Sequence, residues 1–208
     1  MPITRDAIDE LAPSLAPHVR RTPVLEVEPG GLAEVPVVLK LEQLQVTGTF
    51  KARGAFATLL ASDRDEVAMA SGGNAGAAYA YAAGRLGRRA TVFVSSLSPA
   101  AKIDRMRAYG ADVRVVDGDY VAAAEACEAH LAEHDVLAGH AYDRPEMLLG
   151  AGTLARELAE QAPLDTLLVA VGGGGLIGGI ASWYRGDVTV VAVETEGTPT
   201  FHLSLIHI

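Results

Sequence analysis

The sequence has very little cysteine, no long hydrophobic run and no excess of basic residues. Its 208 residues include one cysteine, Cys127, so no disulfide can form within the chain. The longest apolar stretch, from Leu167 to Ala181, is split by four consecutive glycines and is too short to cross a bilayer. Asp and Glu outnumber Lys and Arg by 26 to 17, which gives a net charge of -9. This balance argues against nucleic acid and anionic membranes as partners.

The composition that remains is that of a globular protein. Half of the residues are hydrophobic and 21% are charged, which suffices for a sizeable core under a charged surface. Cys127 lies in a helix-like stretch rich in Ala and Glu, so we interpret it as a buried structural residue and not as a nucleophile. The N-terminus is charged early, so we expect no signal peptide, and a cytoplasmic location fits the single cysteine.

Strand-like and helix-like segments alternate over most of the chain. Strands are expected at 67–70, 91–94, 112–116, 166–171 and 188–194, and helices at 75–85, 121–133, 145–161 and 176–184. Ser98 and Pro99 are expected to be the N-cap and first residue of a further helix that ends near Gly110. Apolar strands that are each followed by a helix indicate an α/β fold with doubly wound parallel sheets. Ligands bind to such folds at the carboxyl ends of the strands.

The first segment with chemical potential is residues 47–54, which read TGTFKARG. A glycine and two threonines are expected to end a strand here, and Phe50, Lys51 and Arg53 to open a helix. A lysine in a poorly hydrated pocket loses proton affinity and becomes a nucleophile for an aldehyde. Taken alone, Lys51 favours a simpler interpretation as a solvated lysine at a helix start, because surface lysines are common.

The second segment, residues 71–76, follows the strand expected at 67–70. Its two adjacent glycines permit a sharp turn and a close approach of ligand to backbone. Backbone N–H groups at the start of the next helix suit a carboxylate or a phosphate. A plain turn in which Asn74 caps the helix is an equally good interpretation of this segment alone.

The third segment joins a strand to a helix through four consecutive glycines, Gly172, Gly173, Gly174 and Gly175. Their N–H groups can converge on one anion at the helix N-terminus, which is typical of phosphate binding. Gly173, Gly175 and Gly178 also fit the G-x-G-x-x-G pattern of dinucleotide-binding folds, with Glu194 at the end of the next strand. The segment alone therefore leaves an NAD(P)-binding oxidoreductase open.

Together the three segments resemble those of the fold-type II pyridoxal-phosphate enzymes, most of all the threonine/serine dehydratase and serine racemase branch. The resemblance begins at residues 21–23 (RTP), continues through 47–54 and 71–74, includes a Gly-x-Gly-Thr helix start at 150–153, and reaches 172–175. The order and spacing of the motifs agree throughout. A dinucleotide-binding enzyme would account only for the third segment, so the family interpretation is favoured.

The resemblance implies a role for each matching residue. Lys51 would hold pyridoxal phosphate as a Schiff base and then act as acid and base at the substrate Cα, and Phe50 would pack beside the pyridine ring. Asn74 would hydrogen-bond the cofactor's 3-hydroxyl, and Ser71 and Gly72, with Asn74 beside them, would bind the substrate through its carboxylate. The amides of the four glycines would hold the phosphate. With L-serine or L-threonine, this chemistry eliminates the β-hydroxyl and yields a 2-oxo acid and ammonia.

The family resemblance also implies two domains. Residues 1–56 and 144–208 would form a large cofactor-binding domain, and 57–143 a smaller inserted α/β domain. A small amino-acid substrate and a homodimer are expected from the same resemblance. Serine racemisation and β-replacement remain alternatives within this fold.

Three features depart from the family pattern. Gly72 stands where racemases have a second serine, so elimination, which needs only Lys51, is favoured over racemisation. Glu194 matches one acid of a divalent cation site in some relatives, but Thr200 stands at the second acid, so Glu194 is a weak candidate and no metal is expected. The last eight residues, 201–208, do not resemble the family and indicate a truncated or foreign C-terminus. An inactive fragment is therefore a further alternative.

Overall fold

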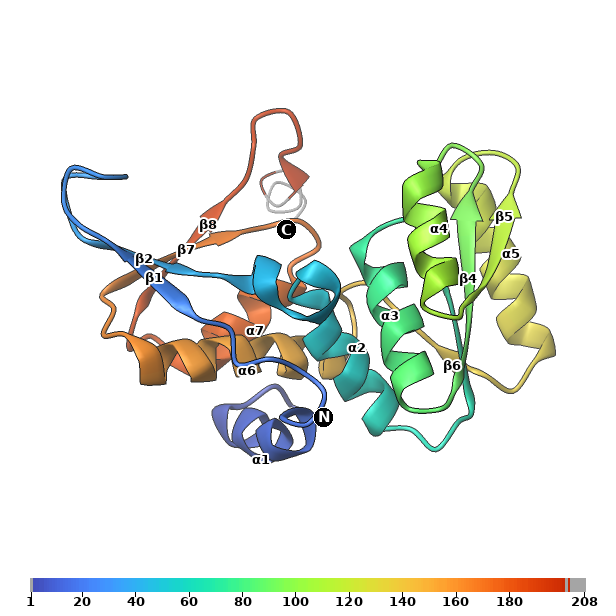
Figure 1. The fold of residues 1–208 in the computed structure, drawn as a ribbon, viewed down its shortest axis with the longest axis horizontal. Helices are drawn as coiled ribbons and strands as arrows, with labels where there is room; N and C mark the ends of the chain where they lie inside the picture. The colour runs from blue at the N-terminus through green and yellow to red at the C-terminus, as the bar shows by residue number, and fades with distance from the viewer. Residues whose placement is uncertain (1, 201, 203–208) are drawn as a thin grey trace.

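The computed structural model describes residues 2–200 and residue 202. It has the α/β architecture with parallel sheets that the sequence predicts, and its elements gather into two bodies (Figure 1). The helix α2 (Lys51–Leu60) lies between the two bodies. Within the described residues, no helix is both long and apolar enough to span a membrane.

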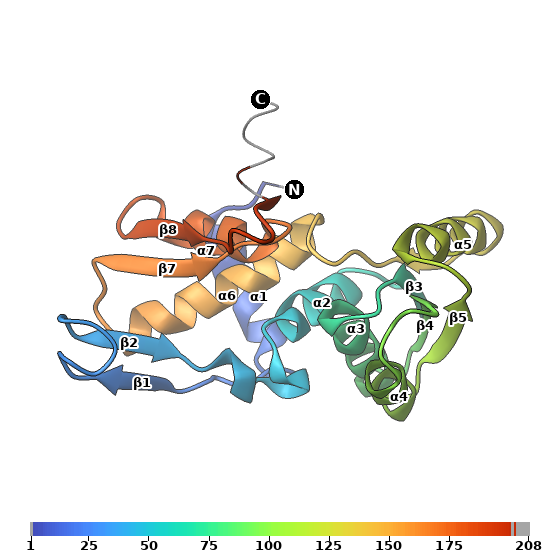
Figure 2. The ribbon, with the colours of Figure 1, turned by 90° about the horizontal axis from the view of Figure 1, so that it is seen from above.

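A four-stranded parallel sheet forms the core of one body. Its strands are β3 (Glu66–Ala70), β4 (Arg89–Ser95), β5 (Asp112–Val116) and β6 (Leu137–Ala138), in the order β5-β4-β3-β6. The helices α3 (Asn74–Arg85), α4 (Ala100–Ala108) and α5 (Tyr120–Glu133) connect them (Figure 2). Ala68 and Phe93 pack on Cys127 of α5, while Val67 and Val92 belong to the core shared with α2 and α3. Helices therefore cover both faces of this sheet.

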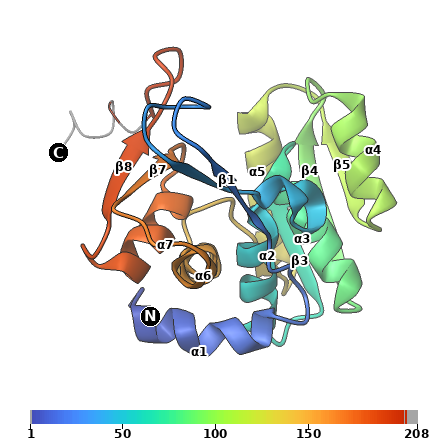
Figure 3. The same ribbon diagram turned by 60° about the vertical axis from the view of Figure 1, so that its left-hand side comes forward.

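The other body contains two small sheets beside three helices. The strands β1 (Val24–Val27) and β2 (Val37–Lys40) pair antiparallel, and β7 (Thr166–Ala170) and β8 (Thr189–Val193) pair parallel. The helices α6 (Pro145–Gln161) and α7 (Gly175–Tyr184) lie beside these sheets, and α1 (Arg5–Leu15) packs against α6 and α7 (Figure 3). Their apolar side chains, including Ile8, Leu154 and Trp183, form a second core. An apolar cavity of about 390 Å³ separates β2 from β7.

Close contacts between glycines and neighbouring backbones bring three helices together. A Cβ on Gly150 of α6 would lie 2.5 Å from the carbonyl oxygen of Arg53 in α2. A Cβ on Gly179 of α7 would collide with the carbonyl oxygen of Leu148 and lie 2.7 Å from the nitrogen of Gly152. The helix α6 is therefore packed tightly against both α2 and α7.

The structure corrects three local expectations. The helix expected to start at Pro99 starts at Ala100, with extended backbone at Pro99 (ψ 131°), so Ser98 is not its cap. The strand expected before Lys51 ends at Lys40, and two 3-10 turns, Glu42–Leu44 and Val46–Gly48, lead to α2 instead. Residues 150–153 lie inside α6 and do not start a helix, because the glycines serve helix packing there.

The expected division of the chain into domains remains a prediction. The boundary expected after residue 56 falls inside α2, and the boundary expected after residue 143 falls just before α6. The buried side chains of α2 contribute to a core that also includes α3 and Met147 of α6. The helix α2 is thus packed against elements on both sides of the expected boundary.

Candidate functional site

Lys51 is the first residue of α2, and its side chain is half-buried. Its Nζ donates a hydrogen bond of 2.6 Å to the carbonyl oxygen of Ala141 and lies 4.9 Å from the centroid of the Phe50 ring. Burial lowers the pKa of Lys51, because removal from water disfavours the charged ammonium. An amine with a lowered pKa is a better nucleophile for a carbonyl carbon.

The turn before Lys51 is held in an unusual backbone conformation. Thr47 has φ 62° and Gly48 has φ 66°, so two successive residues occupy the left-handed region. The guanidinium of Arg105 donates to the carbonyl oxygen of Thr47, and the Thr49 hydroxyl accepts a hydrogen bond of 3.2 Å from the Lys51 amide. These contacts fix the direction in which α2 begins.

The tetraglycine loop, residues 172–175, joins β7 to α7. Gly174 has φ 84°, and nothing lies within 4 Å of a Cβ placed on Gly172 or Gly174. Within the described part of the chain, the amides of Gly172, Gly173 and Gly174 donate no hydrogen bond. Free amides beside open space at the start of a ten-residue helix suit a phosphate group.

The segment that leads into α6 brings Lys51 and the tetraglycine loop together. Ala141 accepts the hydrogen bond from Lys51, and the next side chain, Tyr142, lies against Gly173 and Gly175 so closely that a Cβ on Gly173 would collide with its ring. His140 shapes this segment, since its Nδ1 faces the amide of Tyr142 at 3.3 Å. The sequence offered little warning of this contact, because it joins residues far apart along the chain.

Ser71, Gly72 and Asn74 lie in the loop between β3 and α3. The Ser71 hydroxyl accepts hydrogen bonds from the amides of Gly73 (3.3 Å) and Gly76 (3.1 Å), so its contacts stay within the loop. Asn74 is the exposed first residue of α3 and not its cap. These residues sit at the carboxyl end of a different sheet from the tetraglycine loop.

The structure gives Gly72 a steric neighbour that the sequence did not reveal. A Cβ placed on Gly72 would collide with the hydroxyl oxygen of Ser98 and lie 3.2 Å from the Ser98 Cβ. Ser98 lies in the loop before α4. A side chain at residue 72 would therefore require the Ser98 side chain to move.

A buried ion network lies two residues beyond Lys51. The Arg53 side chain is fully buried, and its guanidinium contacts both carboxylate oxygens of Glu42 (2.8 and 2.9 Å) and both of Glu157 (2.7 and 2.9 Å). It also donates to the hydroxyl of Thr153 and to the carbonyl oxygen of Arg20. Each carboxylate accepts two hydrogen bonds from the planar guanidinium, and a single carboxylate could not accept all four.

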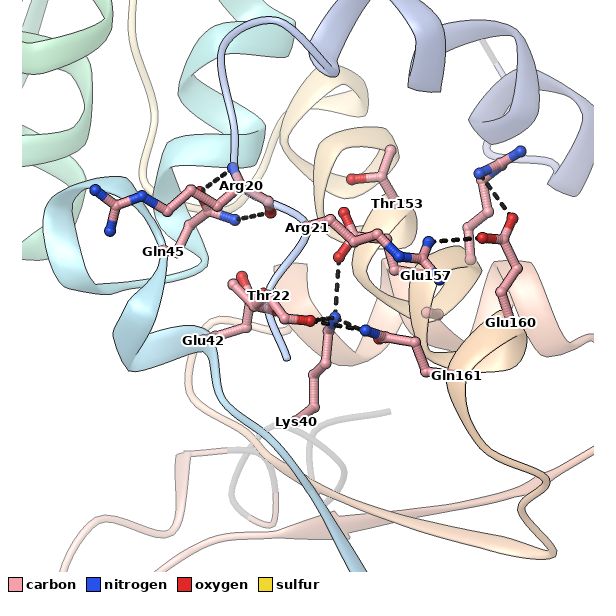
Figure 4. Close-up of polar contacts among 12 residues, drawn as sticks. Arg20, Arg21, Thr22, Lys40, Glu42, Gln45, Thr153, Glu157, Glu160 and Gln161 are labelled. Atoms are coloured by element: carbon pink, nitrogen blue, oxygen red, sulfur yellow. Dashed lines mark hydrogen bonds and ion pairs between the residues drawn. The ribbon is translucent and has the colours of Figure 1, made fainter. Parts of the chain in front are cut away.

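Lys40 extends the network toward the strands (Figure 4). Its Nζ lies 2.9 Å from Glu157, 2.7 Å from Gln161 and 2.8 Å from the carbonyl oxygen of Thr22. Burial alone would raise the pKa of Glu157, but the hydrogen bonds and charges of Arg53 and Lys40 outweigh it and lower that pKa. The sequence motif contains Arg53, yet its partners come from distant segments and could not be inferred from spacing.

The two other candidate residues, Cys127 and Glu194, have surroundings that do not indicate catalysis or metal binding. Cys127 is buried, and burial raises its pKa to about 11, so its thiol is a poor nucleophile. Glu194 accepts a hydrogen bond of 2.7 Å from the amide of His202. Among the residues that the structure describes, no group of three or more His, Cys, Asp or Glu could hold a metal ion.

Comparisons with known proteins agree with this geometry. Residues 15–207 match the family model of the pyridoxal-phosphate dependent enzymes. The chain is 36% identical to an L-threonine ammonia-lyase of Geobacter sulfurreducens and 37% identical to a phenylserine dehydratase of Ralstonia pickettii, in each case over 95% of its length. The solved structure of serine racemase from Dictyostelium discoideum superposes with a TM-score of 0.90 at 30% identity, over 98% of this chain and 69% of that one.

These relatives are considerably longer than the chain. The aligned part is 52% of the Geobacter sulfurreducens protein and 63% of the Ralstonia pickettii protein. The family match extends to residue 207 and so enters the segment that we expected to be unlike the family. Most of that segment, residues 201 and 203–208, lies outside the described residues.

Proposed function

The chain belongs to the family of pyridoxal-phosphate dependent enzymes, and from that premise we propose that it catalyses the elimination of the β-hydroxyl from L-serine or L-threonine. The products would be a 2-oxo acid and ammonia. One observation carries the proposal: the partly desolvated amine of Lys51 bonds to Ala141, whose neighbour Tyr142 covers the tetraglycine loop. The Lys51 amine contacts Ala141, and the tetraglycine loop contacts the next residue, Tyr142. The amine and the loop therefore meet at the same connecting segment.

The residues at this place fit the family's cofactor. The free amides of the tetraglycine loop would hold the phosphate, and Lys51 would hold the aldehyde carbon. Phe50 would border the ring, although in this structure it also lines the cavity between β2 and β7. When bound, pyridoxal phosphate supplies the electron sink that stabilises negative charge at the substrate Cα.

The proton transfers are assigned to Lys51. Burial lowers the proton affinity of the Lys51 amine, which favours its neutral form, and a neutral amine can take the proton from the substrate Cα. The loop of Ser71 and Gly72 would receive the substrate carboxylate, with Asn74 at the start of α3 close to the cofactor's 3-hydroxyl. In these assignments the Lys51 amine is the base for the Cα proton, and the Ser71 loop and Asn74 supply hydrogen-bonding groups to the substrate carboxylate and the cofactor's 3-hydroxyl.

Gly72 supports elimination over racemisation. Racemisation needs a second acid or base on the opposite face of the substrate, and Gly72 has no side chain to provide one. A serine hydroxyl could not be accommodated at this position without movement of Ser98. The names of relatives include both ammonia-lyases and serine racemases, so this local difference is what separates the two activities for this chain.

The activity test uses L-serine and L-threonine with added pyridoxal phosphate. We expect release of ammonia and a 2-oxo acid in equal amounts, and recovery of unreacted serine as the L-enantiomer. The variant Lys51→Met should bring the rate to background, since it removes the only base assigned to the Cα proton. Accumulation of D-serine without release of ammonia would contradict elimination and would identify the reaction as racemisation.

We also propose the finer features of the whole protein. A cytoplasmic location and the absence of nucleic-acid or membrane partners are supported by the net charge of -9 and the single buried cysteine. A homodimer remains a family expectation. The division into a large domain (1–56 and 144–208) and a small domain (57–143) is supported by the separate sheets at either end of α2.

A further inference from the structure

Arg53 and Lys51 leave the same helical turn in opposite directions. Successive residues of an α-helix are rotated by about 100°, so side chains two positions apart point to roughly opposite sides. Lys51 reaches toward Ala141, whereas Arg53 reaches into the network with Glu42 and Glu157. The face of α2 opposite the reactive amine is therefore the face that the buried ion pairs hold.

Glu157 connects this anchor to the helix that also supports the tetraglycine loop. It lies on α6, two turns after Gly150, where the backbones of α6 and α2 are in closest contact. The same helix contacts α7 through Gly152 and Gly179, and α7 begins at the tetraglycine loop. The helix α6 is thus a common support for Lys51 and for the loop.

The fork between Arg53 and Glu157 restrains rotation as well as separation. The glycine contacts set the separation of α2 and α6, and core side chains such as Phe56 and Leu59 hold the later turns of α2. Two parallel hydrogen bonds between a guanidinium and a carboxylate fix both position and orientation. Glu42 closes the other side of the guanidinium, and Lys40 holds the second oxygen of Glu157.

We propose that Glu157, acting through the buried guanidinium of Arg53, is a positioning residue that holds the first turn of α2 so that the Lys51 amine stays directed at Ala141 and the tetraglycine loop. The assignment rests on the proposed function in treating Lys51 as the reacting lysine. Glu157 does not contact the amine and acts only through the orientation of α2.

The test compares Glu157→Gln with Glu160→Gln. Both variants remove one carboxylate charge from α6, but Glu160 pairs with Arg21 and Arg156 at the surface and does not touch Arg53. Acylation of the cofactor-free protein by acetic anhydride is followed against pH, with peptide mass spectrometry to resolve Lys51 from the exposed Lys102. The titratable neighbours on the segment facing the amine, His140 and Tyr142, are present in every variant.

We expect Glu157→Gln to move the midpoint of Lys51 acylation upward by about one pH unit, which is a tenfold slower reaction at a fixed pH below the midpoint. A loosened first turn of α2 would expose the amine to water and raise its proton affinity toward the ordinary value of a lysine. The same variant should bind pyridoxal phosphate about tenfold more weakly by absorbance titration. Glu160→Gln and the Lys102 peptide should show no change in either measurement.

A folded Glu157→Gln variant whose Lys51 midpoint equals that of the unmodified protein would overturn the proposal, as would an equal shift in Glu160→Gln. Circular dichroism and thermal melting establish that each variant is folded. If Glu157→Gln is unfolded, Glu42→Gln is measured in its place with the same two outcomes, because it removes the other carboxylate of Arg53. Failure of the unmodified protein to capture the cofactor would count against the proposed function alone, since acylation needs no cofactor.

Discussion

The amine of Lys51 is partly buried, and this burial lowers its proton affinity. Among the described residues, its hydrogen-bond acceptor is a backbone carbonyl and not a carboxylate, so no opposite charge offsets the loss of hydration of the ammonium. This arrangement destabilises the ammonium form and favours the amine. A buried group with a lowered pKa reduces the stability of the fold, and such perturbed groups are typical of functional sites.

We expect Lys51→Met to raise the melting temperature at neutral pH. The folded pKa of Lys51 is lowered, so the unfolded chain binds more protons than the folded one between the folded pKa and the ordinary lysine value of 10.5. Stability of the unmodified protein should therefore rise with pH through this window. The advantage of Lys51→Met, measured by thermal melting, should shrink as the pH approaches 10.5; an advantage that grows with pH would contradict this account.

Gly72 offers a second prediction at the scale of one residue. Gly72→Ser should lower the free energy of unfolding by about 0.5–1.5 kcal/mol, the order of cost of forcing the half-buried Ser98 side chain off its preferred rotamer. The added Cβ would collide with the Ser98 hydroxyl. Ser98→Ala should restore most of the loss in the double variant. Urea denaturation measures the cycle, and additive losses would show that the two side chains do not meet.

Single residues differ in how far the sequence could predict them. Lys51 could be proposed from the sequence because its motif is local, and two of the three candidate loops, 71–76 and 172–175, fall between the end of a strand and the start of a helix. Tyr142 and the network of Arg53 were missed, because their contacts link positions between 11 and 104 residues apart. Spacing along the chain carries no information about such pairs.

At the scale of elements, α6 determines where the functional loops stand. Its first half presents small residues to α2 and α7, and its second half carries Glu157 and Gln161 to the ion network. The 17-residue length of α6 allows both sets of contacts on one rigid rod. The position of the Lys51 amine and the position of the tetraglycine loop are therefore both set by contacts with α6.

Glycines in the two helices should respond very differently to alanine. Gly150→Ala should cost about 1–3 kcal/mol of stability, because its Cβ would meet the backbone of Arg53 and Gly54, which cannot rotate away. Gly178→Ala is the matched control in α7, where the Cβ meets only the flexible end of Leu148 at 3.2 Å. There we expect no loss, since alanine favours a helix by about 0.5–1 kcal/mol. Equal losses in urea denaturation would refute the role given to Gly150.

Most elements could be predicted from periodicity, while their junctions could not. The strand at 112–116 and the helix at 145–161 have the expected bounds, because apolar patterning and flanking turn residues mark them. The segment before Lys51 was expected to be a strand, yet its backbone forms 3-10 turns around the left-handed Thr47. A hydrogen bond from Arg105 to the carbonyl oxygen of Thr47 stabilises that turn, and no local sequence pattern predicts this contact.

At the scale of the whole molecule, the network of Arg53 joins segments that are remote in sequence. It links the residues before β1, the end of β2, the start of α2 and the second half of α6. Breaking a buried pair by removing one partner typically costs about 3–5 kcal/mol, because the other charge is left uncompensated. The network therefore ties the amino-terminal segments to the site.

We expect this network to make stability sensitive to acid. The pKa of Glu157 is lowered in the folded protein, so its contribution is present above the ordinary carboxyl value of 4.5 and is lost as the pH falls through the folded value. Glu157→Gln should be less stable at neutral pH but should lose less stability as the pH falls below the ordinary carboxyl value of 4.5. Denaturation at several pH values measures this slope, and Glu160→Gln serves as the control. An unchanged slope in Glu157→Gln would contradict the assignment.

The most direct test of the central claim is chemical capture of the cofactor. The chain contains three lysines, Lys40, Lys51 and Lys102, so borohydride reduction with pyridoxal phosphate followed by peptide mass spectrometry gives an unambiguous answer. We predict that the pyridoxyl label is found on Lys51, at a pH where Lys102 is unreactive, and that it disappears in Lys51→Met. A label confined to Lys40 or Lys102, or no label above that of free amines, would contradict the account.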